Sequence, residues 1–171
     1  MPLTLVVTEG VMPKANQPAV IAALSSAFLR LHGLAGNKFL TPNVIGHVQE
    51  IPVGSTFSGL EATPVAIVEW LTPSFGFGSR EVQIAYVKEA TEIIFEACGG
   101  KQPRDRIWVN LKYAVDGMWG IGGKAMTNAE LGEAVAAGFA EPPNVPRVPV
   151  VCWFGRPGTM ARPPKPDHAA C

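Results

Sequence analysis

The residue with the most distinctive chemistry in this sequence is Pro2, which follows Met1 and opens an apolar stretch, Pro2–Thr8. We assume that Met1 is removed, since proline is a small second residue, and Pro2 then carries a free secondary amine. A typical α-amino group has a pKa of about 7.7–8.0, and burial in an apolar pocket lowers it because the cation is desolvated. We therefore expect Pro2 to act as a general acid or base near neutral pH.

The composition limits the partners of such a group. Lysine plus arginine equal aspartate plus glutamate at 14 each, so no net field attracts nucleic acid or an acidic membrane. The three cysteines, Cys98, Cys152 and Cys171, are far apart and fit neither a disulfide framework nor a zinc site, which favours the cytoplasm. We find no signal peptide and no apolar run of membrane-spanning length. With 47% hydrophobic and 16% charged residues, an oligomer is favoured.

The elements that must position Pro2 form two similar units. The first covers residues 2–51, with a strand at 2–8, a helix whose expected N-cap is Asn16, and a strand at 43–51. Apolar residues recur at helical spacing between the two strands: Val20, Ile21, Leu24, Phe28 and Leu31. This pattern predicts a β-α-β unit.

The second unit covers residues 65–113. Its first strand, Val65–Leu71, is apolar enough to be buried on both faces. Ser79 is expected to cap a helix that ends near Cys98, and Ile107–Tyr113 reads as the last strand. Right-handed crossovers make the strands of each unit parallel. We therefore predict an α/β fold with a four-stranded sheet, two helices on one face, and an apolar opposite face that needs a partner.

The rest of the chain has a different character. Trp119–Gly123 is a tight glycine-rich segment, and Thr127–Glu130 fits the capping box of a short third helix. We assign residues 1–140 to the folded domain and residues 141–171 to a partly disordered Pro/Gly-rich extension. Within it, 148–154 is a candidate edge strand and 156–171 a disordered tail.

Pro2, the duplicated unit and the Trp119–Gly123 segment together resemble the tautomerase superfamily. That superfamily includes 4-oxalocrotonate tautomerase, macrophage migration inhibitory factor and cis-3-chloroacrylic acid dehalogenase. The resemblance spans roughly residues 2–135 and is greatest to the longer, trimeric members. It implies a homotrimer with a barrel-like core and an amino-terminal proline in a pocket between subunits. It also implies a small carboxylate-bearing substrate and no metal or organic cofactor.

Candidate cations for the substrate carboxylate follow from the same resemblance. Arg80 corresponds approximately to one of the dehalogenase arginines, and a position in the first turn of a helix suits a bidentate pair with a carboxylate. Lys38 lies near the pocket lysine of the inhibitory-factor branch. Lys112 and Tyr113 remain alternatives.

The other candidate site residues are an amide and two tryptophans. Asn110 lies where long members place a polar or phenolic group, and we expect it to polarise the substrate carbonyl. Trp108 and Trp119 are expected to wall the pocket and exclude water, which would lower the pKa of Pro2. His32 and His47 have no metal-ligand spacing, and we expect structural roles for them.

Three functions stay open at this point. The first is keto-enol tautomerisation of a small 2-oxo or enol acid by Pro2. The second is addition of water to a haloacrylate, as in a dehalogenase or hydratase, with Asp116 as the carboxylate nearest to the family's water-activating glutamate. The third is a non-enzymatic binding protein on the same scaffold.

Overall fold

The structure is a computed structural model that describes residues 1–139. The extension predicted at 141–171, with its edge strand and tail, lies outside the described residues. Among the helices of residues 1–139, none combines the length and the apolar character needed to cross a membrane.

The first unit consists of β1 (Pro2–Thr8), α1 (Gln17–Leu31) and β2 (Ile45–Ile51). β1 and β2 are parallel, as the crossover predicts. Two short 3-10 turns, η1 (Lys14–Asn16) and η2 (Thr41–Asn43), join the elements. Between the units lies a small hairpin of β3 (Phe57–Ser58) and β4 (Glu61–Ala62).

Asn16 is the N-cap residue of α1 and Pro18 lies in its first turn, as predicted, but the Asn16 side chain makes no capping hydrogen bond. Instead, Asn16 Nδ2 donates to the carbonyl oxygen of Ala97 at 2.8 Å. Asn16 therefore ties the start of α1 to the end of the second long helix, a contact that local sequence does not reveal.

The second unit consists of β5 (Ala66–Pro73), α2 (Arg80–Ala97) and β6 (Ile107–Ala114), which is preceded by the 3-10 turn η3 (Arg104–Arg106). β5 and β6 are parallel, and the Ser79 hydroxyl caps α2 by accepting from the Val82 N–H at 3.3 Å. β1 pairs antiparallel with β5, which gives the strand order β2-β1-β5-β6. The predicted four-stranded α/β sheet is confirmed.

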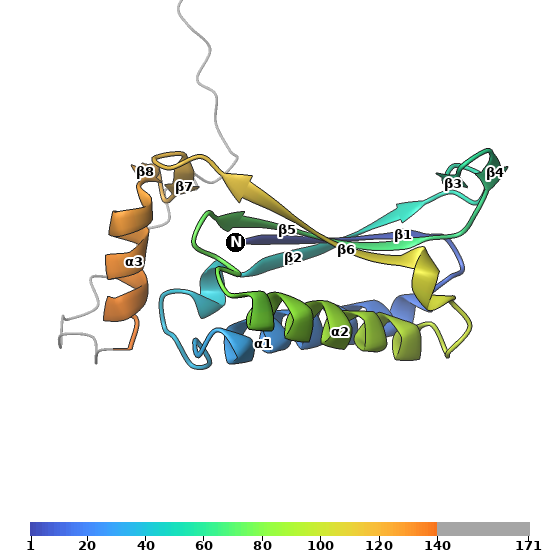
Figure 1. Ribbon diagram of the computed structural model, residues 1–171, viewed down its shortest axis with the longest axis horizontal. Helices are drawn as coiled ribbons and strands as arrows, with labels where there is room; N and C mark the ends of the chain where they lie inside the picture. Colours follow the sequence, from blue (N-terminus) through green and yellow to red (C-terminus); the bar gives the residue numbers. More distant parts are fainter. Residues whose placement is uncertain (140–171) are drawn as a thin grey trace, which may run out of the picture. The chain divides into compact units, whose positions relative to one another are not determined.

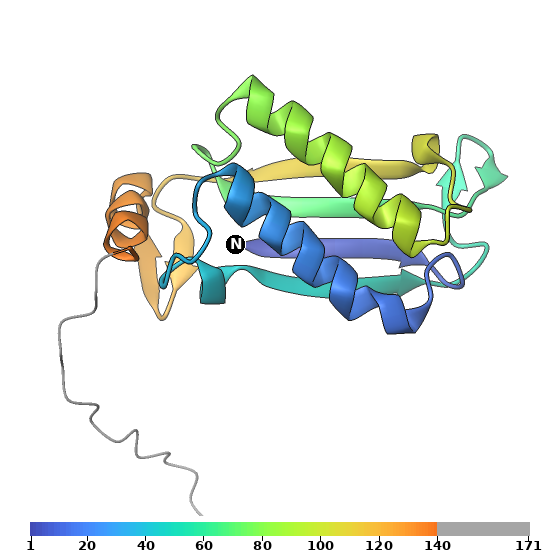
Figure 2. The same ribbon diagram turned by 90° about the horizontal axis from the view of Figure 1, so that it is seen from below.

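Both long helices lie on the same face of this sheet (Figures 1 and 2). Leu3 and Leu5 of β1 are buried beneath them beside Trp70 and Val68 of β5, because alternate residues of a strand share a face. Trp70 stacks on Phe28 of α1, with 4.6 Å between ring centroids. The core therefore sits between the sheet and the two helices.

The opposite face is mixed rather than apolar, and here the prediction is wrong. On it, Lys112 Nζ lies 3.0 Å from Glu69 Oε2. Its large apolar side chains, including Ile45 and Trp108, remain partly exposed. β5 contains one charged residue, Glu69, and the period of two places that residue away from the helices. The β5 sequence is therefore apolar overall, but Glu69 makes its open face mixed.

Three further elements gather at the end of the sheet where the chain begins (Figure 1). β7 (Trp119–Ile121) and β8 (Lys124–Met126) form a hairpin whose turn, Gly122-Gly123, has φ values of 58° and 81°. The glycine-rich segment is therefore a tight turn, because residues with a Cβ rarely adopt positive φ. α3 (Asn128–Ala137) follows, with the predicted capping box present between Thr127 and Glu130.

Candidate active site

The amino terminus lies among several converging segments. The end of α1, the loop that follows it, the end of β5, the β7–β8 hairpin and α3 all lie at this end of the sheet (Figures 1 and 2). Met1 is only 7% exposed. Its amine donates a hydrogen bond to the carbonyl oxygen of Asn43, and its carbonyl oxygen accepts from the Ile45 N–H at 3.1 Å. Met1 thus extends the pairing of β1 with the β2 segment by one residue, and its side chain is buried.

On one side of Met1 is a cavity of about 240 Å³, which we call the inner chamber. Most of its wall is apolar side chains from α1, the loop after it, the loop after β5, and α3: Phe28, Leu34, Leu40, Phe75, Leu131 and Val135. His32, Pro73 and Gly76 complete the wall. Within residues 1–139, His32 is the only titratable side chain that lines it. The inner chamber is suited to an apolar group.

On the other side of Met1 is a hollow of about 290 Å³, which we call the outer hollow. It is lined by Met1, Pro2, Asn43, Ile45 and the hairpin residues 119–122. Met1 lines both spaces. After removal of Met1, the amino terminus would be the nitrogen of Pro2, which lines the outer hollow.

The amine at this position is desolvated. Burial lowers the pKa of the Met1 amine from 8.0 to about 6. Loss of Met1 would move the terminal nitrogen to Pro2, one residue or about 3.8 Å along β1. Pro2 itself is exposed in the single chain, and the lowered pKa is that of the Met1 amine.

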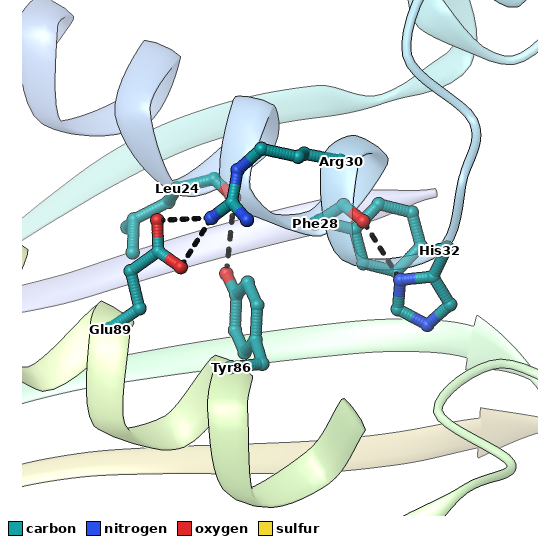
Figure 3. Close-up of polar contacts among 6 residues, drawn as sticks. All are labelled: Leu24, Phe28, Arg30, His32, Tyr86 and Glu89. Atoms are coloured by element: carbon teal, nitrogen blue, oxygen red, sulfur yellow. Dashed lines mark hydrogen bonds and ion pairs between the residues drawn. The ribbon is translucent and has the colours of Figure 1, made fainter. Parts of the chain in front are cut away.

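His32, which follows the last residue of α1, forms part of the chamber wall. Figure 3 shows its contact with the Phe28 carbonyl oxygen. Its Nε2 accepts from the Phe77 N–H at 3.2 Å, so Nδ1 carries the proton and donates to the Phe28 carbonyl oxygen at 2.8 Å. Burial lowers the pKa of the imidazole. His32 is therefore a neutral residue with both nitrogens engaged, and the Phe77 backbone that it holds has a φ of 55°.

The wall of the chamber is fixed by contacts between α1 and α2, which Figure 3 also shows. The Tyr86 hydroxyl donates to the Leu24 carbonyl oxygen at 3.3 Å and accepts from Trp70 Nε1 at 2.7 Å. Arg30 Nη2 contacts the Glu89 carboxylate at 2.6 and 2.5 Å. These contacts hold α1, and with it Phe28 and His32, in place.

The structure brings Trp119 to Pro2, but it separates the other aromatic and amide candidates from Pro2 within one chain. Trp119 lines the outer hollow together with Pro2. The strand register extends from Pro2 to Leu71 and on to Lys112. Asn110 lies in the next row of the same face, about 7 Å along the strand, and Trp108 about 13 Å along it.

The candidate cations also lie away from the two spaces. Arg80 is exposed, and its Nη1 donates to Gln83 Oε1 at 3.3 Å. Lys38 has an exposed side chain, while its backbone N–H donates to the Gly138 carbonyl oxygen at 2.9 Å. In the part of the chain that the structure describes, no lysine or arginine lines the inner chamber or the outer hollow.

Asp116, the candidate water-activating carboxylate, also has a structural contact. Asp116 Oδ1 accepts from the Asn128 N–H at 2.6 Å, so its carboxylate helps to hold the start of α3. No group of three or more His, Cys, Asp or Glu side chains in residues 1–139 could hold a metal ion.

Asn37 is a residue of this region that the sequence reasoning missed. It is fully buried, and its Nδ2 donates to the Val135 carbonyl oxygen of α3 at 2.7 Å. Its Oδ1 accepts from the Phe39 and Leu40 N–H groups at 3.1 and 2.7 Å. Asn37 thus attaches α3 to the loop after α1 and closes the chamber. Its place beside Gly36 in a turn was the only local signal.

No family model matches the sequence, and no curated protein matches it. Solved structures do match. A fused 4-OT solved as a symmetric trimer is 16% identical, with a TM-score of 0.63 over 77% of this chain and 99% of that chain. N1, a member of the cis-3-chloroacrylic acid dehalogenase family, is 12% identical, with a TM-score of 0.63 over 78% and 88%. Malonate semialdehyde decarboxylase is 19% identical, with a TM-score of 0.55 over 73% and 94%.

The chain has the fold of these solved structures. The matches cover nearly all of each fused 4-OT structure, so the predicted two-unit α/β fold is confirmed. About three quarters of this chain is covered, which corresponds closely to its described part.

Proposed function

We propose that the chain, once Met1 has been removed, is a cofactor-independent tautomerase in which the Pro2 amine moves a proton within a small 2-oxo or enol carboxylic acid. The observation that carries this proposal is the burial of the amino terminus between the inner chamber and the outer hollow, where the pKa of the Met1 amine is lowered to about 6. The tautomerase fold supports it.

The reaction needs one base and no redox step. The neutral Pro2 nitrogen takes the proton of the enol hydroxyl, and the O–H electron pair becomes the second bond of the 2-oxo group. The electrons of the C2=C3 double bond then take a proton at C3 from the Pro2 cation. The amine returns to its neutral form, so atoms and charge balance. General acid–base catalysis of this kind contributes on the order of 10²- to 10⁴-fold in rate.

We also propose a homotrimer, the assembly of the fused 4-OT structure that this chain resembles. The open face of the sheet carries partly exposed apolar side chains that association would cover. A second copy would also supply what one copy lacks at Pro2. In this proposal Arg80, Lys38 or Lys112 holds the substrate carboxylate, and Asn110 and Trp108 reach a neighbouring subunit's outer hollow.

The deciding experiment compares the protein with and without Met1, each verified by intact mass. We expect the processed protein to ketonise phenylenolpyruvate or 2-hydroxymuconate. Protein that retains Met1, produced with methionine aminopeptidase inhibited, should lose at least about 100-fold of this activity because its secondary amine is an amide. Circular dichroism of both forms controls for folding.

Three other results would contradict this proposal. Equal rates for the two forms would contradict catalysis by Pro2. Release of halide from 3-chloroacrylate without tautomerisation would favour the dehalogenase reading. A folded mature protein that keeps Met1 in its native host would favour a binding protein.

A further inference from the structure

Thr72, near the end of β5, carries a buried hydroxyl that nothing in the proposed reaction yet uses. The residue is 0% exposed. Among the described residues, its Oγ1 is the buried side-chain polar atom without a hydrogen-bond partner. Buried hydroxyl groups are almost always hydrogen-bonded, because burial without a partner costs stability. The position of Thr72 therefore calls for a functional explanation.

That position is beside Met1 and the inner chamber. The antiparallel register pairs Leu3 with Trp70, and its continuation by two residues places Thr72 opposite Met1. Alternation puts both side chains on the helix-covered face, where directly opposed side chains are in contact range. Gly76, which lines the chamber, covers the hydroxyl: a Cβ built there would lie 3.0 Å from Thr72 Oγ1. Thr72 is fully buried and lines neither space while Met1 is present.

We propose that, after Met1 is removed, the Thr72 hydroxyl donates a hydrogen bond to the 2-oxygen of the substrate, while the inner chamber receives an apolar substituent of the same molecule. This inference rests on the proposed tautomerase function and names its substrate class: 2-oxo or enol acids with an aryl or branched alkyl group at C3. Negative charge grows on the 2-oxygen as Pro2 takes the enol proton. A preorganised donor in a water-poor site stabilises that charge.

The lining of the chamber sets the preference against a second carboxylate. Its wall is apolar, its one imidazole is engaged on both nitrogens, and no lysine or arginine of residues 1–139 reaches it. A carboxylate placed there would lose its hydration without gaining a partner. A phenyl or alkyl group meets no such penalty.

The test uses Met1-free protein, two substrates and three variants. We expect wild type to have a kcat/KM at least tenfold higher for phenylenolpyruvate than for the dicarboxylate 2-hydroxymuconate. T72V, which keeps the shape but removes the hydroxyl, should lose about a hundred- to a thousandfold of kcat for phenylenolpyruvate. T72S should stay within about threefold of wild type. T8V is the matched control, because Thr8 is a buried threonine at the far end of the sheet whose hydroxyl is bonded to Thr56.

The outcomes separate the inference from the function on which it rests. Turnover with T72V within twofold of wild type, or a preference for 2-hydroxymuconate, would overturn the inference and leave the tautomerase proposal standing. If neither substrate is turned over, the tautomerase proposal fails. Calorimetric binding of phenylpyruvate then tests whether the inner chamber binds an aryl group. Binding that weakens in T72V but not in T8V would support the site, and no binding to wild type would overturn it.

Discussion

The hydrogen bonds of His32 determine the role of this residue in the chamber wall. An imidazole on an apolar wall beside a proton-transfer site invites a catalytic role. Its two nitrogens are however committed, one donating to Phe28 and one accepting from the strained Phe77 backbone. A protonated ring could not accept from Phe77. The role that the geometry supports is to hold the loop at Phe77 and to keep charge out of the chamber.

This role predicts a particular pH dependence of stability. Because burial lowers the pKa of His32 in the folded state, the unfolded chain binds a proton at higher pH than the folded chain does. Stability should therefore be full above the unfolded value of about 6.5 and decline as pH falls below it. In H32Q, a neutral amide replaces the ring, and the decline in urea midpoint between pH 7 and pH 5 should become shallower.

The matched control is H47Q, which removes an exposed histidine from the open face of the sheet. H47Q should keep the wild-type slope of urea midpoint against pH. A slope that is unchanged in H32Q would show that His32 does not set the acid sensitivity of the fold.

At the scale of elements, the site depends on how α3 is attached. α3 supplies Leu131 and Val135 to the inner chamber, yet its own sequence shows only a capping box. The attachment runs through Asn37, which bonds its own loop with Oδ1 and α3 with Nδ2. The two functions of this side chain can be separated by one substitution.

N37D keeps an acceptor for the loop but replaces the donor to Val135 with an oxygen. Facing the Val135 carbonyl, that oxygen should cost about 1–3 kcal/mol of the local stability of α3. We expect faster hydrogen exchange in α3, unchanged exchange in β1 and β5, and weaker binding of apolar ligands. N43D is the matched control, since Asn43 Nδ2 makes a similar bond to the Phe39 carbonyl oxygen without touching α3. Equal exchange of α3 in both variants would argue against the attachment.

The elements themselves were largely predictable, and their contacts were not. Helical spacing, Ser79 and the Thr127 capping box predict α1, α2 and α3 because these signals are local. The row that joins Pro2 to Lys112, and separates it from Asn110, depends on the register of three strands and cannot be read from any one of them. The inner chamber and the partnerless Thr72 arise from segments far apart in sequence. Trp119 could be paired with Pro2 only through a resemblance.

At the scale of the whole molecule, the open face of the sheet raises the question of what covers it. The face combines the Glu69–Lys112 pair with apolar side chains such as Trp108, which is 37% exposed, and Ile45, which is 60% exposed. A face of this mixed kind tolerates water better than an apolar one. It is also typical of subunit interfaces, which combine aromatic anchors with polar pairs.

The trimer proposal therefore predicts a particular response to W108E. In solution the wild-type protein should have three times the 18.1 kDa mass of one chain. Burying an unpaired carboxylate in place of an apolar ring costs several kcal/mol per subunit, so W108E should dissociate at micromolar concentration and lose activity with its neighbouring subunits. I84E makes the same charge change on α2 at a side chain that is 55% exposed, and it should remain a trimer. Light scattering coupled to gel filtration measures both. A trimeric W108E would show that Trp108 does not lie in the subunit interface. A monomeric wild type that is fully active would contradict the trimer proposal and require Pro2 to act with the residues of its own chain alone.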